Sequence, residues 1–473
     1  MSHRLVGLDF GRGIGILGVI LSHSFQGPAT NWDTNVLLDL ATKVPLLILI
    51  VVFIPIVFAS LLGSLFFFIT AIGVTISSLR IRTKGTKYVW KYIIMKVVFS
   101  FLLKFMEDAW KTILKYYPFM QGKIALPEIK LNYFSHSLDN VGFNSWFVPL
   151  VVLGITSIPK LHYYYQMAIL CVISMILIAI KDYSLSFFAH LATWFQEKEY
   201  FFFYYLCMKM CDGHFSIAQY APYGLVGGAY GILFHNTKDF KLYWKFTWIL
   251  VAIYFAYGIP AICFVPDLPS QIFAWVKPIP YLFVIGGVQC LAMMLCLQLN
   301  DNPNRPIKKR YSLIRNTTFL RRANTLSLTA YIVEEAFNNA FYIVFKTFFG
   351  PGADRENHIC LWPWLVVVVF VILCTVMWSY FLVWWEKADF RFSAESQLGA
   401  IMSWLFQVPY NKIDYAKNIY GALDDITAEM TAELKAEGLG NGEGEVIEMD
   451  GMSATTNKDE IRETCTTSTE KKD

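Results

Sequence analysis

Long apolar segments separated by short polar ones make up most of the chain. A helix needs about 20 mainly apolar residues to cross the hydrocarbon core of a bilayer. The segments that fit this pattern are 6–24, 50–79, 92–116, 144–158, 163–180, 216–235, 246–263, 280–298, 324–349 and 361–385. The pattern therefore predicts an all-α integral membrane protein with about ten transmembrane helices.

Positive charges in the connecting loops test this topology. With a cytoplasmic N-terminus, 19 lysines and arginines fall in the predicted inner loops and 8 in the predicted outer loops. This bias agrees with the positive-inside rule. The stretch 41–79 is long enough for two spans, but the alternation holds if it crosses once, with its first part at the interface or re-entrant. Both termini are then predicted to be cytoplasmic, in a membrane that the sequence does not identify.

The polar remainder is confined to the C-terminal part. We expect residues 1–400 to form a single membrane domain and residues 401–437 a cytoplasmic amphipathic or helical segment. Residues 438–473 are rich in Gly, Ser and Thr and carry nine acidic against four basic residues. Because this stretch lacks the apolar side chains needed for a core, it is predicted to be a disordered acidic tail.

Composition excludes a soluble globular protein. Hydrophobic residues make up 56% of the chain and charged residues 16%, and the mean hydropathy is +0.44. The net charge of +4 reflects the loop charges described above, so no nucleic-acid partner is predicted. Membrane lipid is the first expected partner.

The first predicted span contains two ionisable residues, Arg12 and His23, that are eleven positions apart. This separation is three helical turns plus about 20°, so both side chains lie on one stripe, roughly 16 Å apart along the axis. Ionisable groups at such depth are costly and usually face a protein interior or a wet cavity. Asp9, three residues before Arg12, is expected to pair with it and to compensate its charge.

A second polar stripe follows the predicted helix 92–116. Its members are Lys96, Ser100, Lys104, Glu107 and Lys111. If this helix spans the membrane, the stripe must face a cavity or other polar helices. If it lies flat at the interface, the stripe faces headgroups instead. The alternation of loop charges favours the spanning orientation.

Two adjacent carboxylates, Glu334 and Glu335, lie at mid-depth in the predicted span 324–349. They point about 100° apart, so only one of them is expected to address a central cavity. A buried carboxylate here is either the salt-bridge partner of a buried cation, such as Arg12 or Lys104, or part of an acid–base site.

The sequence Leu8-Asp9-x-x-Arg12-Gly13 followed by His23 resembles the first-span signature of a known family. This is the membrane-bound acyltransferase 3 family and its relatives, which include the heparan-α-glucosaminide N-acetyltransferase group. Ten spans with cytoplasmic termini are similar to the family's core. Further similar segments are 66–73 followed by Arg80, 328–331, and Trp385 with Arg391 and Phe392.

The resemblance implies transfer of an acetyl or short acyl group from cytoplasmic acyl-CoA to an extracytoplasmic or lumenal acceptor. The acceptor would be a hydroxyl or amine, often of a glycan. His23 would act as a general base or carry the acyl group transiently. The catalytic set would be His23, Arg12 and Glu335, supported by Asp9 and Glu334. The donor would contact Arg80, Arg82, Lys96 and Lys104, and no metal is expected.

Two other functions fit the same residues. The first is a multi-pass transporter or flippase whose polar pathway is lined by Arg12, the lysine stripe and the glutamates. The second is a non-catalytic acyltransferase-like protein that serves as a receptor or scaffold. An acyltransferase should open to the cytoplasm with His23 at the far end, whereas a transporter should pair broken helices about a midplane site.

Overall fold

The computed structural model describes residues 5–30, 33–48, 50, 64–115, 137–213, 215–268, 271, 276–354, 356–407 and 413–436. Within these ranges it does not describe the side chains of residues 34, 110–115, 137, 335 and 433–436. Glu335, Lys111 and the predicted tail, residues 438–473, therefore lie outside the described part. The chain divides into two compact units, Met1–Ala422 and Leu423–Asp473. Of the second unit only the end of one helix is described.

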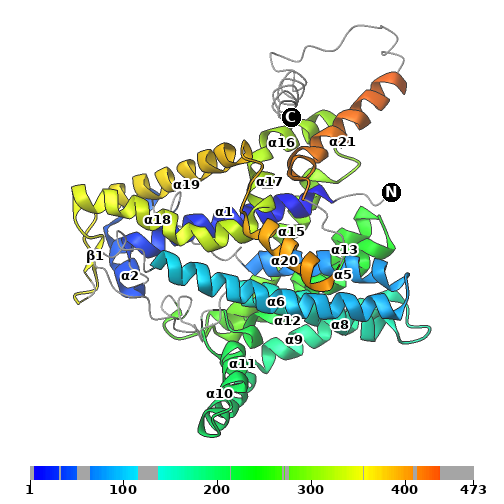
Figure 1. The fold of residues 1–473 in the computed structure, drawn as a ribbon, viewed down its shortest axis with the longest axis horizontal. Coiled ribbons are helices and arrows are strands. Elements are labelled where there is room, and N and C mark those ends of the chain that lie inside the picture. The colour runs from blue at the N-terminus through cyan, green and yellow to red at the C-terminus, as the bar shows by residue number, and fades with distance from the viewer. Residues whose placement is uncertain are drawn as a thin grey trace, which may run out of the picture. The chain divides into compact units, whose positions relative to one another are not determined.

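The described residues are nearly all helical (Figure 1). The elements of the N-terminal half are α1 (Val6–Ser24), the π-helix η1 (Phe25–Ala29), α2 (Thr34–Lys43), α3 (Leu46–Ile48), α5 (Leu65–Arg82), α6 (Thr86–Lys115), α8 (Ser137–Thr156), α9 (Tyr163–Ala179), α10 (Lys181–Glu197), α11 (Phe201–Cys211) and α12 (Ile217–Asn236). Those that follow are α13 (Phe240–Ile262), α15 (Ile279–Asn300), α16 (Ile307–Asn316), α17 (Thr318–Thr325), α18 (Ser327–Phe349), β1 (Ala353–Asp354), β2 (Ile359–Cys360), α19 (Trp364–Glu386), α20 (Ala394–Phe406) and α21 (Tyr415–Ala436). The two short strands pair antiparallel.

Six helices in the described part are long and apolar enough to cross a membrane: Val6–Ala29, Leu65–Arg82, Leu138–Thr156, Phe240–Ile262, Ile279–Asn300 and Trp364–Glu386. The pair α9 and α10, bent by 66°, would add a seventh. The prediction of an all-α protein with several possible membrane spans is thus confirmed, whereas the number of ten is not. The remaining predicted spans lie on α6, α12 and α18, which are helical but are not among the helices long and apolar enough to cross a membrane.

Helix α12 is covered by other helices along most of its length. It packs against α5, α8 and α9, and all but one of its residues from 217 to 233 are buried. Four glycines let its neighbours approach closely, as at Gly227, where a Cβ would lie 2.4 Å from the carbonyl oxygen of Phe68. Because protein rather than lipid covers this helix, its sequence does not need the hydropathy of a lipid-facing span.

Helix α1 lies in contact with α5, α15, α17, α18 and α19 (Figure 1). Its sequence contains a stripe of small residues, Gly11, Gly15 and Gly18, of a kind that allows another helix to approach closely. The tightest described approaches occur elsewhere on α1. A Cβ at Gly13 would lie 2.3 Å from the carbonyl oxygen of Leu320, and one at Gly7 would lie 2.6 Å from that of Cys296.

Gly13→Ala is therefore expected to destabilise the protein. The added methyl group would push α1 away from the backbone of α17, and overpacking of this kind costs about 1–3 kcal/mol. We expect a lower Tm in detergent by several degrees, measured by thermal unfolding of the purified protein. Gly154→Ala is the matched control, because a Cβ at Gly154 meets nothing within 4 Å. Equal Tm values for the two variants would contradict the close contact.

Asp301, which follows α15, caps the N-terminus of α1. Its carboxylate accepts hydrogen bonds from the backbone N–H groups of Val6 (2.8 Å) and Gly7 (2.6 Å). Burial raises the pKa of Asp301 to about 7, although these two hydrogen bonds act in the opposite direction. The cap holds the start of α1 against the end of α15.

Asp301→Asn is expected to change how stability depends on pH. The ordinary pKa of an aspartate is 3.8 and that of folded Asp301 is about 7, so folding is linked to proton binding between these values. The protonated carboxyl contributes fully to stability below the ordinary pKa of aspartate, and this contribution is lost as the pH rises to the pKa of Asp301 in the folded protein. The Tm advantage of the wild type over the variant should therefore shrink between about pH 4 and about pH 7. A constant difference across this range would argue against the buried, protonated carboxyl.

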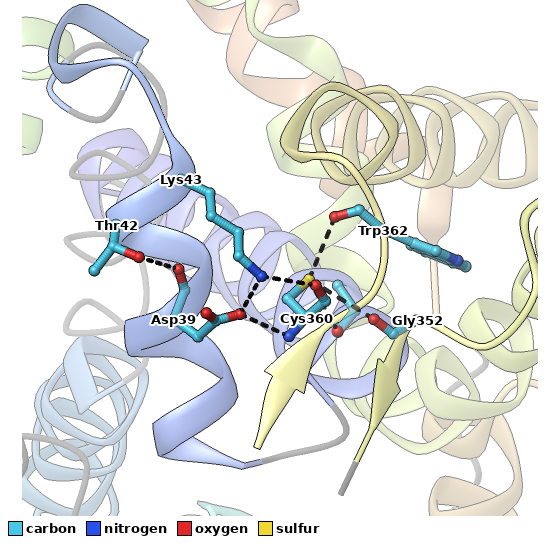
Figure 2. A network of polar contacts seen from close by, with 7 residues as sticks. Asp39, Thr42, Lys43, Gly352, Cys360 and Trp362 are labelled. Carbon is cyan, nitrogen blue, oxygen red and sulfur yellow. Dashed lines mark hydrogen bonds and ion pairs between the residues drawn. The ribbon is translucent and has the colours of Figure 1, made fainter. Parts of the chain in front are cut away.

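A network of polar contacts joins α2 to the strand pair between α18 and α19 (Figure 2). Lys43 Nζ donates to Asp39 Oδ2 (2.6 Å) and to the carbonyl oxygen of Cys360 (3.2 Å), and the Cys360 N–H donates to Asp39 Oδ2 (2.8 Å). Burial alone would raise the pKa of Asp39, but the hydrogen bonds from Lys43 and Cys360 hold it below its ordinary value. Cys360 Sγ also lies 3.8 Å from the carbonyl oxygen of Ala29. The network thereby contacts η1, the segment that directly follows α1.

Candidate functional site

The contact between α1 and α18 brings His23 to Glu334. His23 Nδ1 is within hydrogen-bond and ion-pair distance of Glu334 Oε1. The side chain of Glu334 is 3% exposed, whereas that of His23 is 23% exposed. The ring of Tyr331 meets the imidazole edge to face, with centroids 6.2 Å apart. A buried carboxylate thus holds one nitrogen of an imidazole that remains partly accessible.

One residue further along α1, the buried hydroxyl of Ser24 lies 3.1 Å from Asn338 Oδ1. Glu334 and Asn338 are four residues apart on α18, so they lie on the same face of that helix. Within the described part of the chain, Glu334 Oε2 and Asn338 Nδ2 are buried and have no hydrogen-bond partner. Buried polar atoms are nearly always hydrogen-bonded to protein or water, so these two mark a place for a ligand group or an ordered water.

Local sequence accounts for this arrangement. Tyr331, Glu334 and Asn338 are spaced three and four residues apart, which places them on one face of α18, toward α1. On α1 the helix changes directly after Ser24 into the π-helix η1, which contains Pro28. Single-turn π segments are rare in proteins overall, but those that occur are often found at functional sites. His23 is therefore held just before an irregular turn that the network in Figure 2 contacts.

Arg12 and Asp9 meet a different partner, Asn324 at the end of α17. The side chain of Asn324 donates to Asp9 Oδ1 (3.0 Å) and accepts from an Arg12 guanidinium N–H (3.4 Å). The guanidinium also lies 5.9 Å from the centre of the Phe66 ring. Arg12 and Asp9 thus share a polar contact about three turns away from His23 along α1.

The charge of Lys104 is compensated inside the protein. Lys104 Nζ lies 3.4 Å from Glu107, 2.9 Å from Asp108 and 3.7 Å from Asp139, and Lys209 Nζ lies 3.3 Å from the same Asp139. Both lysines are nearly fully buried. Among the described residues, three carboxylates thus surround these two lysines and offset their charge.

The other predicted donor contacts lie apart from Lys104. Lys96 packs its ammonium group against the rings of Tyr92 (5.6 Å) and Phe99 (5.1 Å). Arg80 and Arg82 are exposed at the end of α5, before α6 begins. Lys104 is 18 residues beyond the start of α6, or about 27 Å along the helix. The structure therefore does not gather these four residues into one site.

Arg82 lies at a cavity of about 400 Å³ where the ends of α5, α8 and α12 meet the start of α9. Its lining residues are Leu79, Arg82, Thr83, Thr156, Gln166, Ile232, His235 and Asn236. An Arg82 guanidinium N–H donates to the hydroxyl of Thr156 at 2.7 Å.

Comparison of this chain with protein families, with curated proteins and with solved structures finds no match.

Asn324 and Asn338 were not among the site residues predicted from the sequence. Asn338 continues the polar face of Tyr331 and Glu334, so the same three- and four-residue spacing that identified the stripe on residues 92–116 could have revealed it. Asn324 gave no such signal, because its role depends on the packing of α17 against α1. The described partner of His23 is Glu334, which was expected to have the supporting role, whereas the side chain of Glu335 lies outside the described residues.

Proposed function

We propose that this protein is a membrane-bound acyltransferase that uses His23 to activate the acceptor. The single observation that supports this function most strongly is the contact between His23 Nδ1 and the buried carboxylate of Glu334. A histidine oriented by a carboxylate is a recurrent arrangement in acyl-transfer enzymes, because the carboxylate fixes the tautomer and stabilises the imidazolium that forms. The resemblance of the first span to membrane-bound acyltransferases agrees with this chemistry.

In the proposed reaction the proton of the imidazole is on Nδ1, toward Glu334, and the lone pair on Nε2 accepts a proton from the acceptor hydroxyl or amine. The acceptor atom attacks the carbonyl carbon of the acyl thioester. The carbon–sulfur bond then breaks, and the thiolate of coenzyme A leaves and takes up the proton from His23. In the alternative route Nε2 itself attacks the thioester carbonyl, the carbon–sulfur bond breaks and the thiolate of coenzyme A leaves. The acceptor then displaces the acyl group from the imidazole, and the acceptor's proton passes to the imidazole and on to the thiolate.

Asn338 is our candidate for stabilising the oxyanion of the acyl group. Its Nδ2 is buried, lies one turn from Glu334 and has no partner among the described residues. A preorganised donor in a water-poor site stabilises developing negative charge strongly. Arg12 and Asp9, tied to Asn324, are assigned to holding α1 and α17 together rather than to the reacting atoms.

A transporter remains the second candidate, and a specific observation favours it. The buried cluster of Lys104, Lys209 and three carboxylates is of the kind that lines ion or proton pathways in membrane proteins. A transporter would move its substrate between compartments without changing it covalently. An acyltransferase would release free coenzyme A.

The test uses the purified full-length protein in detergent or nanodiscs with acetyl-CoA labelled on the acetyl group. We expect label to move to one member of a panel of glycans and amino sugars, with an equal amount of free thiol released. The proposal would be overturned if no member of the panel gave a labelled product and thiol were released only at the rate of uncatalysed hydrolysis. Uptake of unmodified substrate into proteoliposomes would instead favour the transporter.

A further inference from the structure

The cavity beside Arg82 is separate from the His23 site in its residues and its chemistry. Its eight lining residues combine a guanidinium, an imidazole, two amides and two hydroxyl groups with two aliphatic side chains. No carboxylate belongs to this lining in the described part of the chain. We propose that the cavity binds a phosphate group, carried either by the headgroup of an anionic lipid or by a soluble phosphorylated molecule.

Arg82 supplies the main recognition group. Its described hydrogen bond is to the hydroxyl of Thr156, and none of the ion pairs among the described residues involves its guanidinium. A guanidinium has five N–H donors, and two of them can bind two oxygens of one phosphate. The contact with Thr156 holds the side chain at the cavity and leaves donors for a ligand.

The neighbouring groups add to this preference. Arg80 lies near His235 and adds a second positive charge close to the cavity. Gln166 Nε2 donates to the carbonyl oxygen of Leu161 (2.7 Å), and Asn236 Nδ2 donates to that of Ile232 (2.8 Å). Each of these amide nitrogens carries a second N–H group. The lining thus presents several donors and a cation, which is the complement of a phosphate.

The predicted topology places the cavity at the inner surface of the membrane. The loops next to it carry Lys84, Lys160 and Lys238, which are exposed. Basic pockets between helices on the cytoplasmic side are a known mode of binding anionic headgroups. Basic residues also stabilise helix C-termini, and Arg82 and His235 both lie in last turns. That role accounts for their charge but not for an open volume of about 400 Å³ between them.

The proposed phosphate site is independent of acyl transfer, because the lining of this cavity contains neither His23 nor Glu334. The experiment compares wild type, Arg82→Gln and Lys308→Gln, all as purified full-length protein. Lys308 is exposed, lies in a loop predicted to face the same side and does not line the cavity. Native mass spectrometry would measure binding of phosphatidic acid against phosphatidylcholine, and thermal unfolding would measure stabilisation by inorganic phosphate.

We expect Arg82→Gln to weaken phosphate binding by about tenfold or more, while Lys308→Gln stays close to wild type. A preference for phosphatidic acid that is lost in Arg82→Gln would identify a lipid headgroup as the source of the bound phosphate group. Stabilisation by inorganic phosphate that depends on Arg82, without a lipid preference, identifies a soluble ligand. No binding of either probe, or equal losses in both variants, overturns the proposal. His23→Ala should retain the binding, so failure of the phosphate site and failure of acyl transfer are distinguishable.

Discussion

His23→Ala is expected to abolish acyl transfer while the protein stays folded. The proposed mechanism assigns proton transfer or acyl transfer to this imidazole, so its loss removes the chemical step. Removal of a general base or nucleophile of this kind lowers turnover by roughly 10³-fold or more. The measurement is release of labelled product from acetyl-CoA by the purified variant.

The control for this variant is His190→Ala, which removes an exposed histidine on α10. It should retain wild-type turnover, and both variants should elute as the wild type does on size exclusion. Acid quenching during turnover separates the two roles of His23, because an acyl-imidazole carries label on the protein whereas a general base does not. Normal turnover by His23→Ala would end the proposed mechanism.

Glu334→Gln is expected to have the second largest effect. The amide keeps the shape of the side chain but cannot stabilise an imidazolium, and it can favour the wrong tautomer by donating to Nδ1. By analogy with other histidine–carboxylate pairs, we expect kcat to fall by about 10³- to 10⁴-fold. Because Glu334 acts through His23, KM for the donor should change little and Glu334→Asp should restore part of the activity.

A merely structural glutamate would give a different result. It would lower Tm and leave the kcat of the folded fraction unchanged, and Glu334→Asp would then be no better than Glu334→Gln. Glu197→Gln, an exposed position on α10, serves as the control for the change of charge. Equal kcat values for Glu334→Gln and Glu197→Gln would contradict the assigned role.

Helix positions were predictable from the sequence because long apolar runs favour helices whatever their neighbours are. Residues 6–24 and 280–298 correspond closely to α1 and α15. Membrane crossing was less predictable, as α12 shows: its burial among α5, α8 and α9 is a property of the fold. A count of apolar residues does not distinguish a helix that faces lipid from one that faces protein.

Candidate residues were predictable one helix at a time. The stripe of Arg12 and His23 follows from helical geometry alone, and so does the presence of a buried carboxylate at Glu334 or Glu335. Which residue pairs with which was not predictable. Asp9 and Arg12 both hydrogen-bond Asn324, which lies more than three hundred positions further along the chain and was not predicted. Lys104 was expected to contact a donor, and it instead lies among three carboxylates.

The helical character of this protein, its several apolar helices and the ionisable residues within them can all be read from single segments of the chain, because they depend on spacing and hydropathy within each segment. The contact of His23 with Glu334, the positions of Asn338 and Ser24 beside them, and the cavity next to Arg82 become visible only in the folded chain. Contacts between helices depend on which faces pack together and in which register, and that information is distributed over the whole chain.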